Sequence, residues 1–381
     1  MTKDPTPTPP VPPSPLAAVP GAVGAPTAEH YGDPVAEQRA LVAGRALVDL
    51  SDRGIVTVTG PDRLRWLDSL TSQALTGLAP GDSAETLLLD PNGRIEHAMH
   101  VVDDGVTTWL IVEGSEAAGL AAWLDRMRFM MQVEVADVSG QWAVIGAMSP
   151  DGAEPSIPPA APNGAPLVWR DPWSAVQVGG WQYAAEAEHP AGEYPARELI
   201  VERAFLAELA GLARAGGVRL AGSLAWEALR VAAWRPRFAA EVDEKSIPHE
   251  VDWLRSAVHL AKGCYRGQET VAKVHNLGRP PRRIVMLHLD GSDALLPAAG
   301  TLVHAADADR AEVGRVTSVA RHHELGPIAL AVVKRSLDVA ATLVVPVDGV
   351  DVAAAQELIV PPEAGQAAGV PRLPRLGAQR R

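Results

Sequence analysis

The last third of the chain limits the choice of fold most strongly, because short extended runs follow one another there without a helical segment between them. Each run is rich in Val, Leu or Ala and is bounded by turn residues. The runs are "IVMLHLDG", "GTLVHAA", "AEVGRVTSVA", "GPIALAVVKR" and "ATLVVPVDG". Several short strands separated by turns are typical of a small antiparallel barrel. We therefore predict a C-terminal β-barrel over residues 281–358.

The chain before residue 284 alternates between strand and helix patterns. "GIVTVTG" alternates as a strand does, and "PDRLRWLDSLTSQAL" opens with Pro-Asp and then places leucines on one helical face. In "AETLLLDPNGRIEHAMHVV" two extended runs meet at Asn92-Gly93, a pair that suits the positive φ angles of a tight hairpin. A further strand, "VTTWLIVEG", precedes the amphipathic helix pattern "SEAAGLAAWLDRMRFMM". This order indicates a mixed α+β unit.

A second group of elements follows a Pro/Gly-rich insertion at residues 151–166. Short strands are expected in "LVWR", "AVQVGG" and "QYAAEAE", and a helix near residues 196–214. The predicted fold class is α+β, with two α+β modules and the barrel. The predicted domains are residues 31–140 together with 215–280, residues 141–214, and residues 281–358.

Both ends of the chain have the composition of disordered extensions. Residues 1–30 are rich in proline, and residues 359–381 are rich in Pro, Gly and Ala and end in two arginines. The apolar run near the start is broken by Pro20, whereas a signal peptide needs an unbroken run and a membrane span needs about 20 apolar residues. We therefore expect a cytoplasmic protein that has no membrane segment.

Charge and cysteine content narrow the range of partners. The chain has 34 Lys and Arg against 46 Asp and Glu, a formal net charge of -12, which disfavours a broad contact with nucleic-acid phosphates. We expect no direct nucleic-acid binding. The chain has 1 cysteine, which cannot form an internal disulfide. Nor can a single thiol hold an iron-sulfur cluster, which usually takes four ligands.

That cysteine lies in the segment "KGCYRGQE". Gly263 and Gly267 free the backbone around Cys264, and "GQETVAKVHN" has the pattern of a helix. A helix N-terminus and the charges of Lys262 and Arg266 would lower the thiol pKa, an effect that Glu269 opposes. We predict a reactive Cys264; the alternative is a small residue half-buried in a turn. The residues expected to support it are Lys262, Gly263, Tyr265, Arg266, Gly267, Gln268 and Glu269.

The motif "KGCYRGQETVA", followed by "NLGRPPRR", closely resembles the signature of the YgfZ family of folate-binding proteins. These are relatives of the glycine cleavage system T protein, the tetrahydrofolate-dependent aminomethyltransferase. "VTGPDRLRWLDSLTSQALTGLAPG", "LLLDPNGRI" and "LAWEALRVAAWRP" also resemble family segments, in the family's order, so the likeness covers residues 35–355. The resemblance implies two α+β modules around a channel for a reduced folate, plus a C-terminal barrel.

The resemblance also implies a function and a set of site residues. Members of the family help to assemble or maintain iron-sulfur clusters in other enzymes, tRNA-modifying enzymes among them. Carried over by position, Cys264 matches the motif cysteine and Trp226 the folate-facing tryptophan. Arg53 stands where the enteric members have a second tryptophan, and a guanidinium can also stack on a ring. Arg230 completes the residues expected at tetrahydrofolate or a derivative.

Other positions depart from the relatives. His97 and Ala98 stand where the aminomethyltransferases carry an acidic pair, so the catalytic carboxylate is absent. Relatives read Glu-Ala-Gly where this chain has Ala232-Ala233-Trp234, which removes a carboxylate expected to bind the pterin. An unmatched buried donor pair would cost roughly 1–3 kcal/mol, enough to weaken folate binding tenfold or more.

Further side chains have both a functional and a structural interpretation. A cysteine hydrolase could use His249, His259 or His275 as its base, but no third group that would orient the base is evident. In "NLGRPPRR", Arg279, Arg282 and Arg283 could bind phosphate or a folate glutamate tail, or form a solvated linker. His322-His323-Glu324 could suggest a metal, but neighbouring histidines on a strand point to opposite faces, so we expect a solvated turn and no metal site. Trp226 could also be a core residue.

Three functions remain open from the sequence. The first is a folate-binding maintenance factor for iron-sulfur proteins that acts through Cys264 and is not a conventional enzyme. The second is a tetrahydrofolate-dependent one-carbon transferase, which His97 and Ala98 disfavour. The third is a folate-sensing scaffold in which the thiol is dispensable.

Overall fold

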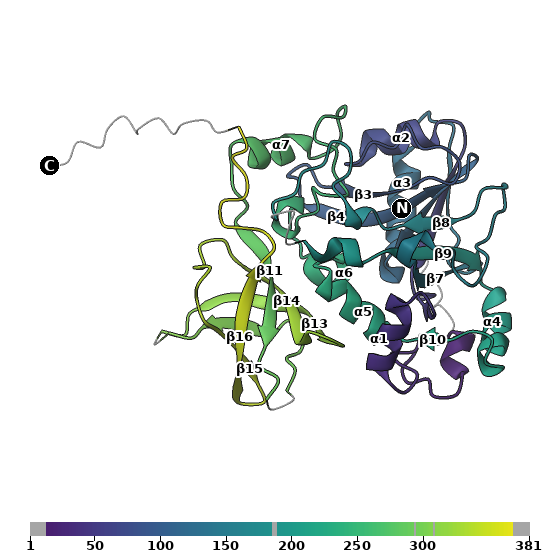
Figure 1. Ribbon diagram of the computed structural model, residues 1–381. Helices are drawn as coiled ribbons and strands as arrows, with labels where there is room; N and C mark the ends of the chain where they lie inside the picture. The colour runs from purple at the N-terminus through teal and green to yellow at the C-terminus, as the bar shows by residue number, and fades with distance from the viewer. Residues whose placement is uncertain (1–12, 185–188, 293–294, 308, 369–381) are drawn as a thin grey trace, which may run out of the picture.

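The computed structural model describes residues 13–184, 189–292, 295–307 and 309–368 of the chain. Two five-stranded sheets with their helices lie beside each other, and a closed β-barrel adjoins them (Figure 1). The predicted α+β class with a C-terminal antiparallel barrel is therefore confirmed.

The first sheet has the strand order β3-β4-β5-β2-β6. Two amphipathic helices pack their apolar side chains, including Trp66 and Leu120, against Val56 and Val58 of this sheet. The hairpin predicted at Asn92-Gly93 is confirmed, and Gly93 has φ 78 in its turn. The elements are β2 (Gly54–Thr59), α2 (Arg63–Leu70), β3 (Ser83–Leu89), β4 (Ile95–Asp103), β5 (Thr107–Val112), η2 (Gly114–Glu116), α3 (Ala117–Met127) and β6 (Glu134–Asp137).

The second sheet has the order β10-β1-β7-β9-β8, and it takes β1 and β10 from outside residues 141–214. Helix α5 packs between this sheet and the barrel, with Trp226 and Leu229 in the core of the sheet. The elements are α1 (Pro34–Val42), β1 (Leu47–Asp49), β7 (Trp142–Met148), η3 (Pro150–Gly152), β8 (Val168–Arg170), η4 (Pro172–Ser174), η6 (Pro190–Glu193), β9 (Ala196–Glu202), α4 (Phe205–Arg214), β10 (Leu220–Ala221) and α5 (Ser223–Ala232).

Three local predictions in this part of the chain were wrong. Residues 196–202 form strand β9 instead of the start of a helix, because they pair with β7 on one side and β8 on the other; the helix begins only at Phe205. Residues 175–180 form no strand, since the chain turns at Gly179, which has φ 75. The strand expected at 182–188 is absent over 182–184, and the rest of it lies outside the described residues.

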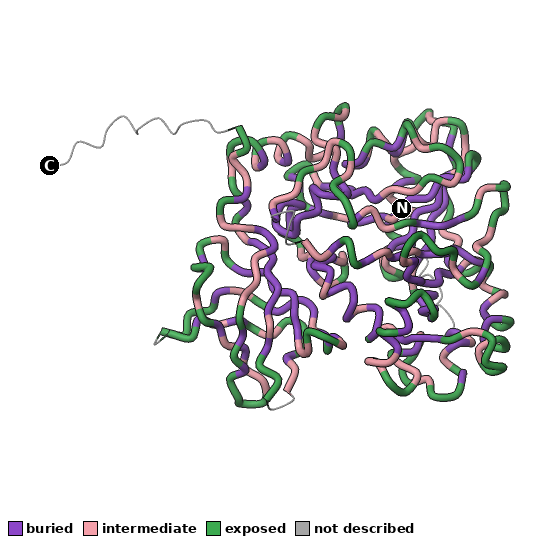
Figure 2. The backbone as a smooth tube through the Cα atoms, in the orientation of Figure 1, coloured by how far each residue is buried: buried purple, intermediate pink, exposed green. Residues whose placement is uncertain are grey.

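The barrel closes because β11 pairs with both β14 and β16. Its interior is filled by small and branched side chains, and Figure 2 shows the buried stretches of its strands. The sixth strand was not predicted, because "VDVAAAQEL" is rich in alanine and poor in β-branched residues. The strands are β11 (Arg282–Leu289), β12 (Leu302–Ala305), β13 (Glu312–His322), β14 (Gly326–Lys334), β15 (Leu343–Val347) and β16 (Val350–Leu358).

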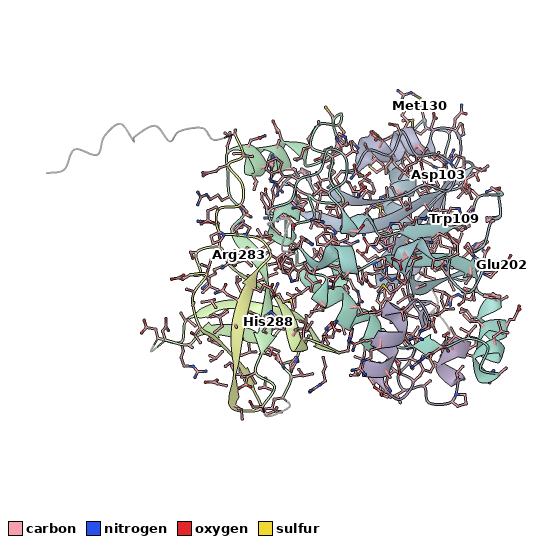
Figure 3. The ribbon with its side chains drawn as sticks, viewed as in Figure 1. Asp103, Trp109, Met130, Glu202, Arg283 and His288 are labelled. Atoms are coloured by element: carbon pink, nitrogen blue, oxygen red, sulfur yellow. The ribbon has the colours of Figure 1, made fainter. Side chains whose placement is uncertain are left out.

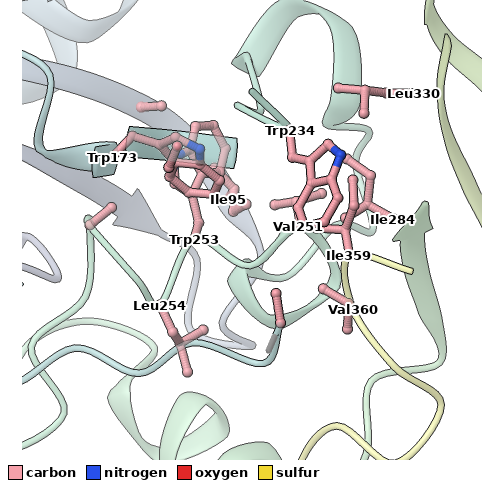
Figure 4. Close-up of a cluster of buried hydrophobic side chains, with 14 of the residues drawn as sticks. Ile95, Trp173, Trp234, Val251, Trp253, Leu254, Ile284, Leu330, Ile359 and Val360 are labelled. Carbon is pink, nitrogen blue, oxygen red and sulfur yellow. The ribbon is translucent and has the colours of Figure 1, made fainter. Parts of the chain in front are cut away.

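An apolar cluster joins the barrel to the α+β units. The Trp234 ring lies among Ile284 and Leu330 of the barrel and Ile359 beyond it (Figure 4). Ile359 is 0% exposed, so the predicted extension at 359–381 does not begin at residue 359. The prediction for residues 1–30 was likewise wrong for the described part, because Leu16, in η1 (Pro15–Ala18), is 0% exposed. Residues 1–12 and 369–381 lie outside the described residues.

The remaining helical elements are short. They are α6 (Phe238–Glu241), η7 (Pro248–Val251) and α7 (Gln268–Asn276). In the described parts of the chain, no helix has the length and apolar character that crossing a membrane would require.

Candidate functional site

Trp226, Arg53 and Arg230, the three residues expected at a folate, line one cavity. Helix α5 contributes Trp226 and Arg230, and Arg53 comes from the turn between β1 and β2. Trp226 is 3% exposed and packs against Gly146, where an added Cβ would lie 3.2 Å from the indole ring. The structural and functional interpretations of Trp226 therefore both apply, since it is a core residue that also forms a wall of the cavity.

An ion pair between the two sheets closes one side of the cavity. Arg53 Nη1 lies 2.7 Å from Glu198 Oε1, and His100 Nδ1 lies 2.9 Å from Glu198 Oε2. The His100 ring stacks on Trp169 with 3.6 Å between ring centroids. Burial raises the pKa of Glu198, but Arg53 and His100 outweigh burial and leave the pKa below its usual value. Glu198 is therefore a buried carboxylate held by two partners.

Arg235 supplies a second buried charge. Its Nη2 lies 2.6 Å from Glu85 Oε1 and its Nε lies 3.0 Å from Asp171 Oδ2. Its Nη1 is buried and has no hydrogen-bond partner among the described residues. Burial raises the pKa of Asp171, in spite of the neighbouring Arg235. The guanidinium also lies 5.2 Å from the centroid of the Trp173 ring. Arg235 Nη1 can thus donate to a ligand or a water molecule.

The other two arginines that line the cavity, Arg230 and Arg237, form hydrogen bonds and ion pairs with acidic side chains. Arg230 donates to Glu227, Glu241, Ser318 and the Arg235 carbonyl, which uses all five of its N–H groups. Arg237 lies 2.7 Å from Glu113 and 3.1 Å from Glu227. Burial opposes ionisation of Glu227, but Arg230 and Arg237 lower its pKa to about 2. Arg230 therefore holds α5 against α6 and the barrel and has no donor left for a ligand.

The size of the cavity bears on what it can hold. Its volume is ≈ 40 Å³, which is room for a few water molecules and less than a pterin ring requires. Trp226 and the free Arg235 N–H could contact a planar heterocycle, but the side chains as they lie do not accommodate one.

The structure also shows where His97, Ala98 and Ala232, the residues expected to differ from the aminomethyltransferases, lie relative to the cavities. Ala98 lines this cavity, and His97 Nδ1 pairs with Glu116 at 2.8 Å, so neither position offers a carboxylate. Ala232 lies elsewhere: it lines a second cavity of ≈ 320 Å³ with Trp234 and residues of the barrel.

Cys264 is exposed and does not line the cavity that holds Trp226. Lys262 fixes one side of its loop, because Nζ donates to the carbonyls of Asp68, Thr71 and Gln73 at 2.5–2.8 Å. Burial lowers the pKa of Lys262, an effect that Asp68 opposes. The ammonium is thus directed at the end of α2 and anchors the loop to it.

The other motif residues hold the opposite side of the loop. Arg266 pairs with Glu96 of β4 and lies over the Trp123 ring, 5.7 Å from its centroid. Gly267 has φ 84, and a Cβ there would lie 2.6 Å from the Asp90 carbonyl of the hairpin. A Cβ at Gly263, by contrast, would meet nothing within 4 Å. Only the second glycine is therefore required by the backbone.

Three residues complete the motif. Tyr265 is 7% exposed, and its buried hydroxyl has no hydrogen-bond partner in the part of the chain that the structure describes. Helix α7 begins at Gln268, as the pattern predicted, and the Gln268 side chain donates to the Lys262 carbonyl at 3.3 Å. Glu269 lies in the first turn of α7. The motif is thus a tight loop between α2, the β3–β4 hairpin and α7.

The alternative sites receive little support. Within the described residues, no hydrogen bond joins Cys264 to His249, His259 or His275. Burial lowers the pKa of His249 to about 3, and its Nε2 lies 3.0 Å from the Val271 carbonyl. No group of three or more metal-binding side chains is arranged around a common point in the described parts of the chain.

Two further expectations about side chains need correction. The rings of His322 and His323 lie 4.4 Å apart instead of on opposite faces, because β13 ends at His322. "NLGRPPRR" is not a solvated linker either: Arg282 pairs with Asp243 and Glu250, and Arg283 is 0% exposed. Arg279 donates to Gln366 at 3.2 Å.

Sequence reasoning missed most of the charged residues that line the cavity. Glu198 lies within strand β9, and Arg235 and Arg237 flank a proline after α5. Glu85, which pairs with Arg235 from strand β3, was missed as well. A charge in a strand that is buried on both faces must be paired, so these positions carry a usable signal. Which acid meets which arginine depends on how the two sheets approach each other.

Comparison with known proteins identifies two domains. The model of the GCVT N-terminal domain matches residues 27–154, and that of the glycine cleavage T-protein C-terminal barrel domain matches residues 282–358. The glycine cleavage system aminomethyltransferase T from Bartonella henselae has a similar structure, with a TM-score of 0.68 at 16% identity, covering 89% of this chain and 94% of that chain. This likeness shows the fold.

Three curated relatives are 23–26% identical to this chain. A chloroplast protein of Arabidopsis thaliana named as a transferase is 25% identical over 72% of this chain, which spans 62% of that relative's length. An aminomethyltransferase of Nostoc sp. is 26% identical over 79% of this chain and 80% of its own. The mitochondrial iron-sulfur cluster assembly factor IBA57 homolog of Mycosarcoma maydis is 23% identical over 63% of this chain and 56% of its own. The chain therefore has the GCVT N-terminal domain and the glycine cleavage T-protein C-terminal barrel domain, and it is a relative of the aminomethyltransferases.

Proposed function

We propose that this protein is a folate-binding maintenance or assembly factor for iron-sulfur proteins, tRNA-modifying enzymes among them, and that it acts through Cys264. The observation that carries the proposal is the position of the thiol: Cys264 is exposed, on a loop anchored by Lys262 and Arg266, and outside the cavity that holds Trp226. A thiol placed there can reach iron or sulfur on another protein. It would lend its lone pair to iron and release its proton to solvent, with no change of oxidation state.

The similarity to an iron-sulfur cluster assembly factor homolog supports this choice. One thiol cannot hold a cluster, so the interaction is transient and the partner supplies the remaining ligands. The role is one of protection or transfer, and it does not require turnover of a small molecule.

The alternative is a tetrahydrofolate-dependent aminomethyl or one-carbon transferase, which the aminomethyltransferase relatives favour. Against it stand His97 and Ala98 at the positions where such enzymes carry an acidic pair. Ala98 lines the cavity and can neither accept a proton nor bind a cation. A third candidate, a folate-sensing scaffold, would not need Cys264.

The small volume of the cavity limits how tightly this protein can bind a folate. Trp226, Arg53 and Arg235 would contact the ring, and the bound folate would supply a one-carbon carrier. Because the cavity holds only ≈ 40 Å³, we expect weak binding that opens the Arg53–Glu198 pair. Titration with tetrahydrofolate should give saturable quenching of tryptophan fluorescence in the wild type and a smaller change in Trp226→Phe.

The proposed function is tested with Cys264→Ala as the only copy in cells. We expect the activity of iron-sulfur enzymes to fall towards that of cells lacking the protein, with the fold and the folate titration unchanged. Val350→Ala, an exposed site on the barrel, is the control. Full enzyme activity with Cys264→Ala would contradict the proposal and favour the scaffold. Transfer of an aminomethyl group to tetrahydrofolate by the purified protein would favour the transferase.

A further inference from the structure

A short turn after α3 presents two large apolar side chains to solvent. Phe129 is 82% exposed and Met130 is 97% exposed. Figure 3 shows Met130 at the upper edge of the molecule, near α2. Isolated exposed apolar residues are ordinary on protein surfaces, but two adjacent large ones at this exposure are not. We refer to residues 126–131 as the apolar tip.

The tip has a fixed conformation. Phe129 has φ 46, a left-handed conformation that costs a non-glycine residue roughly 1–2 kcal/mol. Its neighbours hold it: the Gln132 N–H donates to Asp62 Oδ2 at 2.9 Å, and Arg128 Nε lies 3.2 Å from Asp125. A strained turn that keeps an aromatic ring in water gains nothing within this molecule. It presents the ring to a partner in a preorganised form.

The charges around the tip point to the kind of partner. Arg65 and Arg126 are exposed and form no ion pair within the described residues. Of the two acids nearby, Asp125 pairs with Arg128, and Asp62 accepts the backbone N–H of Gln132 and keeps its negative charge. Three arginines thus outnumber two acids around the tip, a small positive excess on a chain of net charge -12. Aromatic residues, Met and Arg are the residue types enriched at protein interfaces. An anionic membrane would repel the rest of the chain.

The tip lies on the same part of the fold as the cysteine motif. Helix α2 connects them, because Asp62 at its start bonds Gln132 and Asp68 near its end bonds Lys262. Six helical residues span about 9 Å. A standard interface covers about 800 Å² on each partner, a patch roughly 30 Å across, so one partner can contact both the tip and Cys264.

From these observations we propose that the apolar tip docks into a protein partner, and that the partner offers an apolar pocket bordered by carboxylates. Phe129 and Met130 enter the pocket, and Arg65 and Arg126 face its acidic rim. The inference rests on the proposed function in one respect: it takes the docked partner to be the protein whose iron or sulfur meets Cys264.

Photo-cross-linking in cells tests the docking. Benzoylphenylalanine replaces Phe129, and in the matched control it replaces Val350, an exposed residue on the barrel. From position 129 we expect a cross-link to an iron-sulfur or cluster-assembly protein, within a segment that carries apolar and acidic residues. Arg126→Glu should reduce the yield at least about threefold. Cross-links only to a second copy of this chain, binding only to anionic lipid vesicles, or a yield equal to that from position 350 would overturn the inference.

A functional comparison separates this inference from the proposed function. The variants are Phe129→Ser with Met130→Ser, Met130→Ser alone, and Cys264→Ala, each as the only copy in cells. The tip residues are exposed, so their thermal unfolding should match the wild type, and the tip variants should lose iron-sulfur enzyme activity as Cys264→Ala does. Loss with Cys264→Ala but full activity with the tip variants would overturn the docking role and leave the proposed function standing. Full activity with Cys264→Ala would reject the proposed function, and the cross-link alone would then decide the docking.

Discussion

Arg53 and Glu198 form an ion pair, with Nη1 and Oε1 2.7 Å apart, that joins the turn before β2 of the first sheet to β9 of the second. The Glu198 side chain is 2% exposed and that of Arg53 is 13% exposed, so the pair is buried. Removing one member of such a pair leaves the other charge without compensation. This relationship leads to a first prediction about stability.

Arg53→Met should lower the free energy of unfolding by about 3–5 kcal/mol, because Glu198 then keeps His100 as its one ion-pair partner among the described residues. Adding Glu198→Gln should recover most of the loss. The measurement is urea unfolding at pH 7, with Arg65→Met at an exposed site as the control. Equal and additive losses in the two single variants would show that the pair is not coupled.

The two glycines of the cysteine motif give a second prediction. Gly267→Ala should destabilise the protein by more than about 2 kcal/mol, because it combines a left-handed φ of 84 with a Cβ 2.6 Å from the Asp90 carbonyl. Gly263→Ala should be nearly neutral, since its Cβ meets nothing within 4 Å. Urea unfolding and the rate of Cys264 alkylation check both variants. If the two variants behaved alike, the loop would differ from the geometry described above.

The contrast between Gly263 and Gly267 shows which features can be predicted from local sequence and which depend on contacts between distant residues. Local patterns predicted the hairpin at Asn92-Gly93, helix α7 and the barrel, because each depends on residues close together in the chain. Strand β9 was missed because its identity comes from pairing with β7 and β8. The need for glycine at 267 but not at 263 depends on a hairpin more than 150 residues earlier in the chain.

The same distinction applies to the candidate site: some of its residues could be named from the sequence, but the contacts of their side chains could not. The Cys264 loop and the three folate-facing candidates were named from the sequence, and those three do line one cavity. The directions of the side chains were not predictable. Lys262 and Arg266 were expected to act on the sulfur, but their charged groups contact α2 and β4. The Arg235–Glu85 pair joins residues 150 positions apart, and only the packing of the sheets brings them together.

Asp252 gives a third prediction, about pH. Burial raises its pKa to about 7, although the Tyr183 N–H and Arg255 act against this. The folded protein therefore keeps a proton on Asp252 between about pH 4 and 7 that the unfolded chain has lost, so stability falls as pH rises through this range. The full effect is at most about 4 kcal/mol, since one pKa unit corresponds to about 1.4 kcal/mol.

Asp252→Asn isolates this effect. Asparagine tolerates the left-handed φ of 57 and can still accept the Tyr183 N–H. The variant should match the wild type near pH 4 and become progressively more stable than it up to pH 7. The slopes of His249 and other buried histidines run the opposite way, and they cancel in the difference between the two proteins. A constant difference across this pH range would mean that Asp252 does not titrate there.

Trp234 gives the last prediction, because two opposing effects meet at one residue. The side chain is 2% exposed and its Nε1 lies 3.0 Å from Met286 Sδ, while its backbone has φ 58, a left-handed conformation that favours glycine. Removing a buried tryptophan costs about 3–5 kcal/mol, which exceeds the roughly 1–2 kcal/mol of strain that glycine would relieve. Both Trp234→Gly and Trp234→Ala should therefore be less stable than the wild type.

The comparison between those two variants measures the strain at position 234 directly. Both leave nearly the same cavity, but alanine keeps the unfavourable left-handed backbone, so Trp234→Gly should be the more stable by about 0.5–1 kcal/mol after the greater unfolded-state entropy of glycine is counted. Ala228→Gly, in the middle of α5, is the matched control and should lose about 1 kcal/mol, since glycine is unfavourable in a helix. The same Ala-to-Gly change thus stabilises at position 234 and destabilises at position 228. Urea unfolding measures both pairs of variants. If glycine were less stable than alanine at position 234 as well as at position 228, the left-handed backbone at residue 234 would carry no strain.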